Sequence, residues 1–111
     1  MEKDKYIKSE TKKLNKIKEL VPEENKVIAA NLIKEIAFMS ATLEELKGIV
    51  GEKGAVEDFK NGKQEFMRES PALKSYTALI PRYSNLYKQL ISLVSEEVKE
   101  TNSELLDFIN E

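Results

Sequence analysis

The sequence contains no cysteine and no histidine. Without cysteine the chain can form no disulfide framework and no thiolate nucleophile, and the absence of both residue types removes the usual ligands of zinc. Histidine is also the side chain that most often acts as a general acid or base at neutral pH. We therefore predict a protein that is not an enzyme and that uses no cofactor and no metal ion.

Glycine and proline are also scarce, with four and three copies among 111 residues. So few turn-forming residues imply long elements, and this length suits one domain with a single core. No window approaches the ~18 consecutive apolar residues of a membrane span. Residues 1–20 also lack the apolar run of a signal peptide. We expect a soluble, cytoplasmic protein with no membrane partner.

Charged residues are spread unevenly along the chain, although its net charge is only −2. Residues 1–20 carry seven lysines against four carboxylates, a balance of +3, whereas residues 95–111 carry six carboxylates against one lysine, a balance of −5. Such asymmetry often indicates different partners for the two ends of a chain. The alternative is that charged termini only keep a helical protein soluble.

A first helix is predicted within residues 1–21, before Pro22. Its apolar residues fall on one side and four lysines on the other, so the helix is amphipathic. The lysines are suited to contact a phosphate backbone, although a solvated helix face is the simpler interpretation. They are Lys5, Lys8, Lys12 and Lys16.

A second helix is predicted over residues 27–51. It is apolar over so wide an arc that more than one neighbour must cover it. The main stripe consists of Ile28, Leu32, Ile36, Met39, Leu43, Leu46 and Val50, widened by Val27, Phe38 and Ile49 on one flank and by Ala29 and Ile33 on the other.

A β-hairpin is predicted over residues 55–68. Asn61-Gly62 supplies two residues that tolerate the positive φ of a type I′ turn, so we expect this pair to join the two strands. Basic residues around the hairpin form a second candidate surface for DNA: Lys60, Lys63 and Arg68.

A third helix is predicted over residues 71–95. Ser70 can cap its first turn, Pro71 suits the first helical position, and Pro81 should kink it. Its apolar residues recur at alternating steps of three and four, which is typical of a helix that packs in a coiled coil. Its tyrosines can in principle stack bases, but core residues with hydroxyls at the rim are the better interpretation. The residues assigned to oligomerisation are Leu73, Tyr76, Ile80, Tyr83, Leu86, Tyr87 and Leu90.

Together these elements predict an all-α fold: a long antiparallel helical hairpin, a small β-hairpin at its connection, and an N-terminal amphipathic helix. Residues 1–95 would form an oligomerisation domain, because so few elements leave much apolar surface to cover. Residues 96–111 would be an acidic flexible tail with an apolar end. We predict that this end binds a partner as a short helix, with docking on the chain's own helices as the alternative. Its apolar residues are Leu105, Leu106, Phe108 and Ile109.

Between Val27 and Val94 the order of features is more distinctive than any single residue. A long helix is followed by Gly54-x-Val56-x-x-Phe59, by the Asn61-Gly62 turn, by Arg68-x-Ser70-Pro71-Ala72, and by a tyrosine-bearing helix with Lys88-Gln89-Leu90 near its end. In this order the segment resembles the small terminase subunits of tailed bacteriophages, in the branch found in phages of low-GC Gram-positive bacteria.

The resemblance implies a non-catalytic DNA-packaging subunit in the cytoplasm of the host cell. Small terminases form homo-oligomers such as rings, engage viral DNA, and regulate the large terminase subunit, which holds the ATPase and nuclease. The tail would then bind the large subunit. The residues alone leave two other classes open: a helical protein-interaction adaptor or regulator without a nucleic-acid role, and a structural head-assembly protein.

Overall fold

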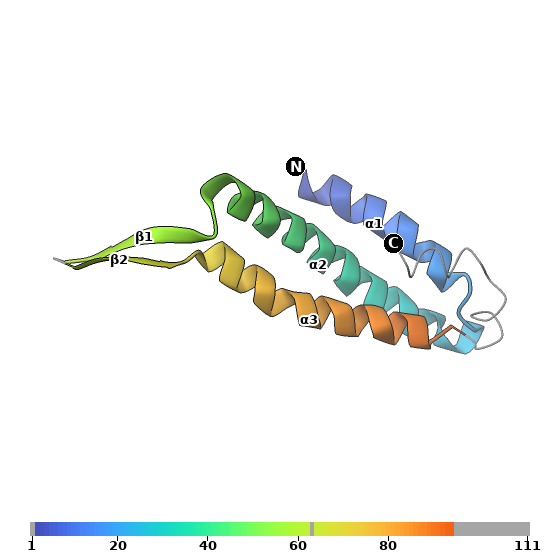
Figure 1. The fold of residues 1–111 in the computed structure, drawn as a ribbon. Helices are drawn as coiled ribbons and strands as arrows, with labels where there is room; N and C mark the ends of the chain where they lie inside the picture. Colours follow the sequence, from blue (N-terminus) through green and yellow to red (C-terminus); the bar gives the residue numbers. More distant parts are fainter. Residues whose placement is uncertain (1, 63, 95–111) are drawn as a thin grey trace.

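The computed structural model describes residues 2–62 and 64–94. This part of the chain forms three α-helices, a short 3₁₀ helix and a two-stranded antiparallel sheet (Figure 1). Their bounds are α1 Lys3–Lys18, η1 Glu23–Asn25, α2 Lys26–Lys53, β1 Val56–Asn61, β2 Gln64–Glu69 and α3 Pro71–Ser92. The predicted helical fold, with a small β-hairpin between the second and third helices, is confirmed.

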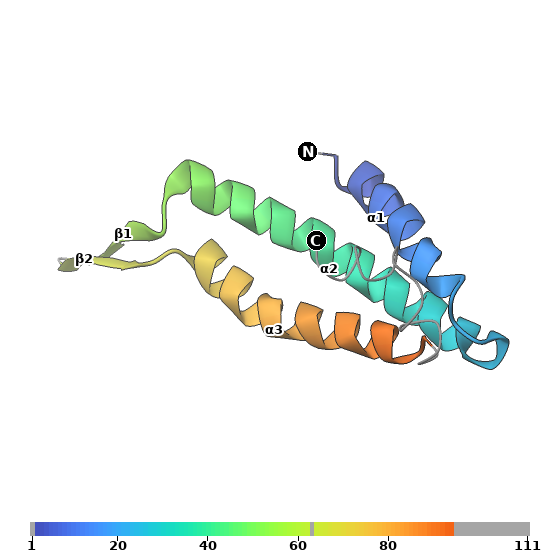
Figure 2. The same ribbon diagram turned by 45° about the vertical axis from the view of Figure 1, so that its right-hand side comes forward.

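The central helix is α2, and α1 and α3 both pack against it in the opposite direction (Figures 1 and 2). Lys3 Nζ, at the start of α1, lies 2.7 Å from Glu45 Oε1 on α2. Beyond that contact α2 continues to Lys53, and there α3 lies beside it but α1 does not (Figure 1). We call this two-helix part, together with the β-hairpin at its tip, the arm.

The core lies at the end of the molecule where all three helices meet. Small side chains at buried positions of α2 let its neighbours approach closely: Ala29, Ala37 and Ala41 are completely buried. The core cluster consists of Leu14, Ile17, Val21, Ala29, Ile33, Ile36, Ala37, Leu90 and Val94.

Part of the apolar arc predicted for α2 is exposed in the single chain. Val27, Phe38 and Ile49 recur every 11 residues, which is about three helical turns, so they point in one direction, and all three are exposed. Ile28, on the predicted main stripe, is exposed in the single chain as well. The helical period shows which apolar side chains share a face, whereas the positions of α1 and α3 decide which of them are covered.

The start of α3 follows the prediction closely. Ser70 is buried, its Oγ accepts a hydrogen bond from the Leu73 N–H at 3.4 Å, and its own N–H donates to the Ala55 carbonyl at 2.8 Å. Pro71 occupies the first helical position. The helix runs without a break through Pro81, and its ribbon bends near the middle, where a kink was expected (Figure 2).

The turn of the hairpin is displaced from its predicted position. Asn61 belongs to β1 and pairs with Gln64, so residues 62 and 63 join the strands. Gly62 has a φ of 62°, whereas no described residue other than glycine has a positive φ. The prediction of a type I′ turn at Asn61-Gly62 is therefore wrong by one position.

Cross-strand pairs explain this register. Phe59 lies opposite Phe66, with ring centroids 5.0 Å apart, and Glu57 lies opposite Arg68, with Arg68 Nη2 2.7 Å from Glu57 Oε1. A turn at Asn61-Gly62 would have placed both aromatic rings opposite polar side chains. Aromatic and oppositely charged pairs directly across two strands stabilise a sheet, so they outweigh the local preference of the turn.

Candidate interaction surfaces

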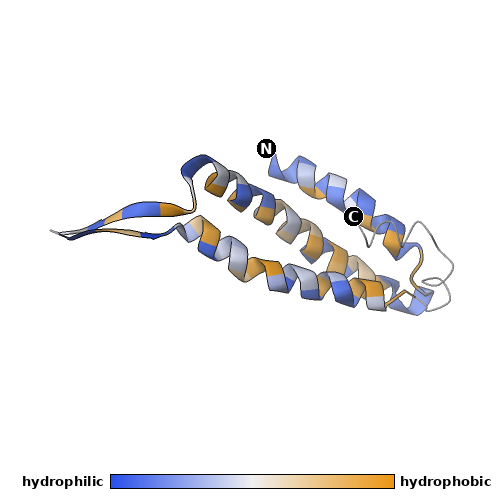
Figure 3. Cartoon of the chain, viewed as in Figure 1, coloured by the Kyte–Doolittle hydropathy of each residue, from blue (hydrophilic) through white to orange (hydrophobic). Residues whose placement is uncertain are grey.

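Four exposed lysines follow the outer side of α1. Figure 3 shows this helix as mainly hydrophilic, with its hydrophobic residues toward α2. At 100° per residue, Lys5, Lys12 and Lys16 point within about 40° of one another, opposite the buried Leu14, and Lys8 lies at the edge of this group. All four side chains are exposed. We call these four residues the lysine face, which is roughly 16 Å long at 1.5 Å per residue.

The lysine face carries charge that the helical bundle does not balance locally. The ion pairs Lys3–Glu45, Lys26–Glu23, Lys60–Glu65 and Arg68–Glu57 use no lysine of this face. Over its whole length α1 carries seven lysines and two carboxylates, a balance of +5. This surface is therefore suited to a polyanion.

The basic residues of the hairpin form a different surface. The hairpin projects from the tip of the arm, away from α1 (Figure 1). Lys60 Nζ lies 3.3 Å from Glu65 Oε1. Arg68 pairs with Glu57 and also lies 4.2 Å above the centre of the Phe59 ring. Carboxylates thus balance both cations, while the third predicted residue, Lys63, lies outside the described residues.

Apolar side chains are exposed along the arm. Met67 is 59% exposed, and every residue of β2 is exposed to solvent. An isolated two-stranded hairpin is only marginally stable in water, and an exposed apolar group of this kind is typical of protein contacts. The arm is therefore a candidate surface for another chain. Its exposed large apolar residues are Ile49, Val56, Phe66 and Met67.

The residues predicted for oligomerisation fall into two groups along α3. Near its end, Leu90 is 0% exposed within the chain's own core, so its assignment to an oligomer contact does not fit this fold. Tyr83, Leu86 and Tyr87 pack against the same core. Toward the start of α3, Ile80 is 39% exposed and the remaining two residues, Leu73 and Tyr76, are half-buried.

A polar contact beside the core was not predicted. The hydroxyls of Tyr6 on α1 and Ser40 on α2 lie 3.3 Å apart, within hydrogen-bonding distance. Burial raises the pKa of Tyr83 on α3 above its usual 10.0, and the nearby Glu10 carboxylate raises it further. This group places polar atoms from all three helices at one contact. Its only sequence signal is the position of each tyrosine at the rim of an apolar stripe.

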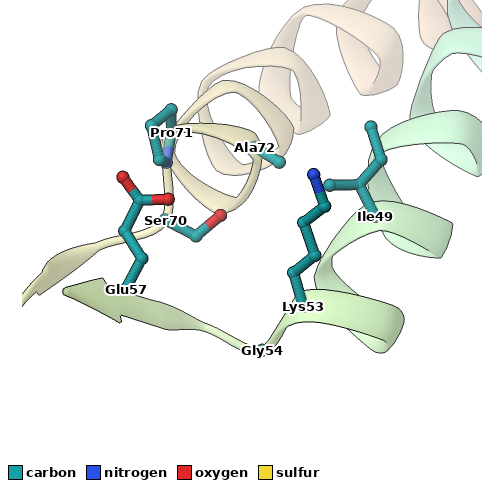
Figure 4. Close-up of a pocket in the computed structure, with 7 residues that line it drawn as sticks. All are labelled: Ile49, Lys53, Gly54, Glu57, Ser70, Pro71 and Ala72. Carbon is teal, nitrogen blue, oxygen red and sulfur yellow. The ribbon is translucent and has the colours of Figure 1, made fainter.

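An open pocket of about 230 Å³ lies where α2, β1 and the start of α3 meet (Figure 4). Ile49, Pro71 and Ala72 give it apolar walls, while Lys53 and Glu57 line it with opposite charges. A space of this size and openness suits a side chain of another protein better than a cofactor.

Within residues 2–62 and 64–94 no group of acidic side chains is arranged to hold a metal ion. None of the helices described there combines the length and apolarity needed to cross a membrane. The predicted tail residues, Leu105, Leu106, Phe108 and Ile109, lie outside this part of the chain. Comparisons of the chain with known protein families, with characterised proteins and with solved structures found no match.

Proposed function

We propose that this chain is a non-catalytic DNA-packaging subunit of the small-terminase type. It self-assembles through the arm, contacts viral DNA through the lysine face, and regulates a large terminase subunit that holds the ATPase and nuclease. The observation that carries the proposal is the lysine face, because its four exposed ammonium groups lie outside every ion pair of the described residues. The resemblance of residues 27–94 to small terminases supplies the biological setting.

The chemistry of the lysine face defines the mode of DNA binding. Lysine ammonium groups that contact only phosphate oxygens carry no sequence information, so we expect binding that is nearly independent of DNA sequence. Each phosphate contact releases counterions, and four contacts give a slope of roughly −3.6 for log K against log salt concentration. In a closed oligomer several lysine faces act together, which steepens this dependence.

The test is a charge reversal at Lys8, Lys12 and Lys16, each changed to Glu, in a DNA-binding titration at several salt concentrations. We expect the unchanged chain to bind duplexes of unrelated sequence equally and the triple variant to lose that binding. The matched control reverses three other exposed lysines, Lys34, Lys47 and Lys88, and should retain most of the affinity. Binding that survives the first triple change would place the DNA contact elsewhere.

Self-assembly is tested separately by light scattering at micromolar concentration. The exposed apolar residues of the arm lead us to expect a closed oligomer, and a folded monomer would contradict this part of the proposal.

The same exposed arm also favours a second candidate, a helical interaction adaptor that dimerises and has no nucleic-acid role. A dimer without DNA binding would favour the adaptor.

A further inference from the structure

We propose that the acidic segment 95–111 docks on the lysine face of its own chain and competes there with DNA. The position of Val94, the length of the following segment and the opposite charges of the two surfaces support this assignment.

Val94 fixes the point from which the segment starts. It is the last described residue before the segment and is buried in the core cluster together with Leu14, Ile17 and Val21. Leu14 and Ile17 lie in the last turns of α1, the same turns that carry Lys12 and Lys16 on the opposite side. Val94 is therefore level with the C-terminal end of the lysine face along the axis of α1, and lies across the helix from it.

The segment is long enough to follow the whole lysine face. Its 17 residues span at most about 56–61 Å when extended, or about 25 Å as a helix. The lysine face is only roughly 16 Å long. The tether also keeps the segment at a high effective concentration near α1, in the millimolar range for a short linker.

The charges of the two surfaces are complementary. The segment carries six carboxylates and one lysine, and the lysine face carries four lysines. Exposed ion pairs are individually weak and are screened by salt. Several such pairs formed by a tethered segment therefore give a contact that holds at low salt and that a longer polyanion can displace.

The docking itself is independent of the proposed function, whereas the competition with DNA rests on it. When the segment occupies the lysine face, DNA must displace it. Binding is then weakened most at low salt, where the internal ion pairs are strongest.

Zero-length cross-linking of the full chain with a carbodiimide tests the docking, since it joins a lysine to a carboxylate only when the two are in contact. An equal mixture of ¹⁴N- and ¹⁵N-labelled chains separates links within one chain from links between chains. Lys3 and Glu45, 2.7 Å apart, provide an internal positive control. We expect links from the lysine face to Glu96, Glu97, Glu100, Glu104 or Asp107 within one isotopic species. If only the control link forms, or if the links join different chains, the proposal is refuted.

Neutralising the segment in the full chain tests the competition. The variant changes Glu96, Glu97, Glu100 and Glu104 to Gln and Asp107 to Asn. The matched control makes the same change of charge at exposed carboxylates outside the segment: Glu24, Glu35, Glu52 and Glu69 to Gln and Asp58 to Asn.

We expect the segment variant to bind duplex DNA on the order of tenfold more tightly than the control variant at low salt, with the difference shrinking as salt rises. Equal affinities of the two variants would overturn the competition. If cross-links form within the chain and no variant binds DNA, the docking stands and the proposed function fails.

Discussion

Leu90 offers the sharpest test of how this chain is held together. Its side chain is 0% exposed in the core formed with Leu14, Ile17, Ile33 and Ile36. Replacing it by alanine removes the equivalent of about three methylene groups from that core, or roughly 2.4 kcal/mol of transfer free energy at about 0.8 kcal/mol each. The cavity left between three helices adds to this cost, so we expect the free energy of unfolding to fall by about 3–5 kcal/mol.

Ile80 provides the matched control on the same helix. It is 39% exposed, so its truncation to alanine loses only part of the transfer free energy and leaves no closed cavity. Alanine is also a better helix former than isoleucine by a few tenths of a kcal/mol. We therefore expect Ile80→Ala to cost no more than about 1 kcal/mol.

Urea denaturation followed by circular dichroism at one fixed protein concentration measures both costs, and the fixed concentration prevents self-association from shifting the comparison. If Leu90→Ala fails to fold, Leu90→Met is the variant to measure in its place, because a swap of similar volume usually costs less than about 1.5 kcal/mol. A cost for Leu90→Ala equal to that of Ile80→Ala would refute the core that we describe.

Four further predictions rest on local features. The pKa of Tyr83 is raised above 10.0 in the folded chain, so the stability that its protonated hydroxyl contributes is present below pH 10.0 and is lost as the pH rises through the raised pKa. Above pH 10.0 the free energy of unfolding of Tyr83→Phe, measured in urea, should therefore decline less steeply than that of the unchanged chain. Ser70→Ala removes the cap of α3 and should cost about 0.5–2 kcal/mol in the same assay; an unchanged stability would contradict the cap. Gly62→Ala is strained at a φ of 62° and should lower the stability of the hairpin by about 1 kcal/mol, read from amide hydrogen exchange. Gly51→Ala, inside α2 with open space around it, should instead raise the melting temperature.

The sequence alone predicted the elements of the fold because their signals are local. Ser70-Pro71 marks the start of α3, since a side-chain cap and a proline at the first helical position depend only on neighbouring residues. The exposed position of the lysine face was likewise predicted from the helical period.

Only the tertiary structure decided which apolar residues are covered and how the strands pair. The turn moved by one position because Phe59 and Glu57 find their partners across the hairpin, and a cross-strand contact is not visible in a local turn preference. Leu90 and Ile80 share one apolar stripe in the sequence, yet Leu90 is buried in the core and Ile80 is 39% exposed. Helical periodicity determines the direction of a side chain, and the neighbouring helices determine what that side chain contacts.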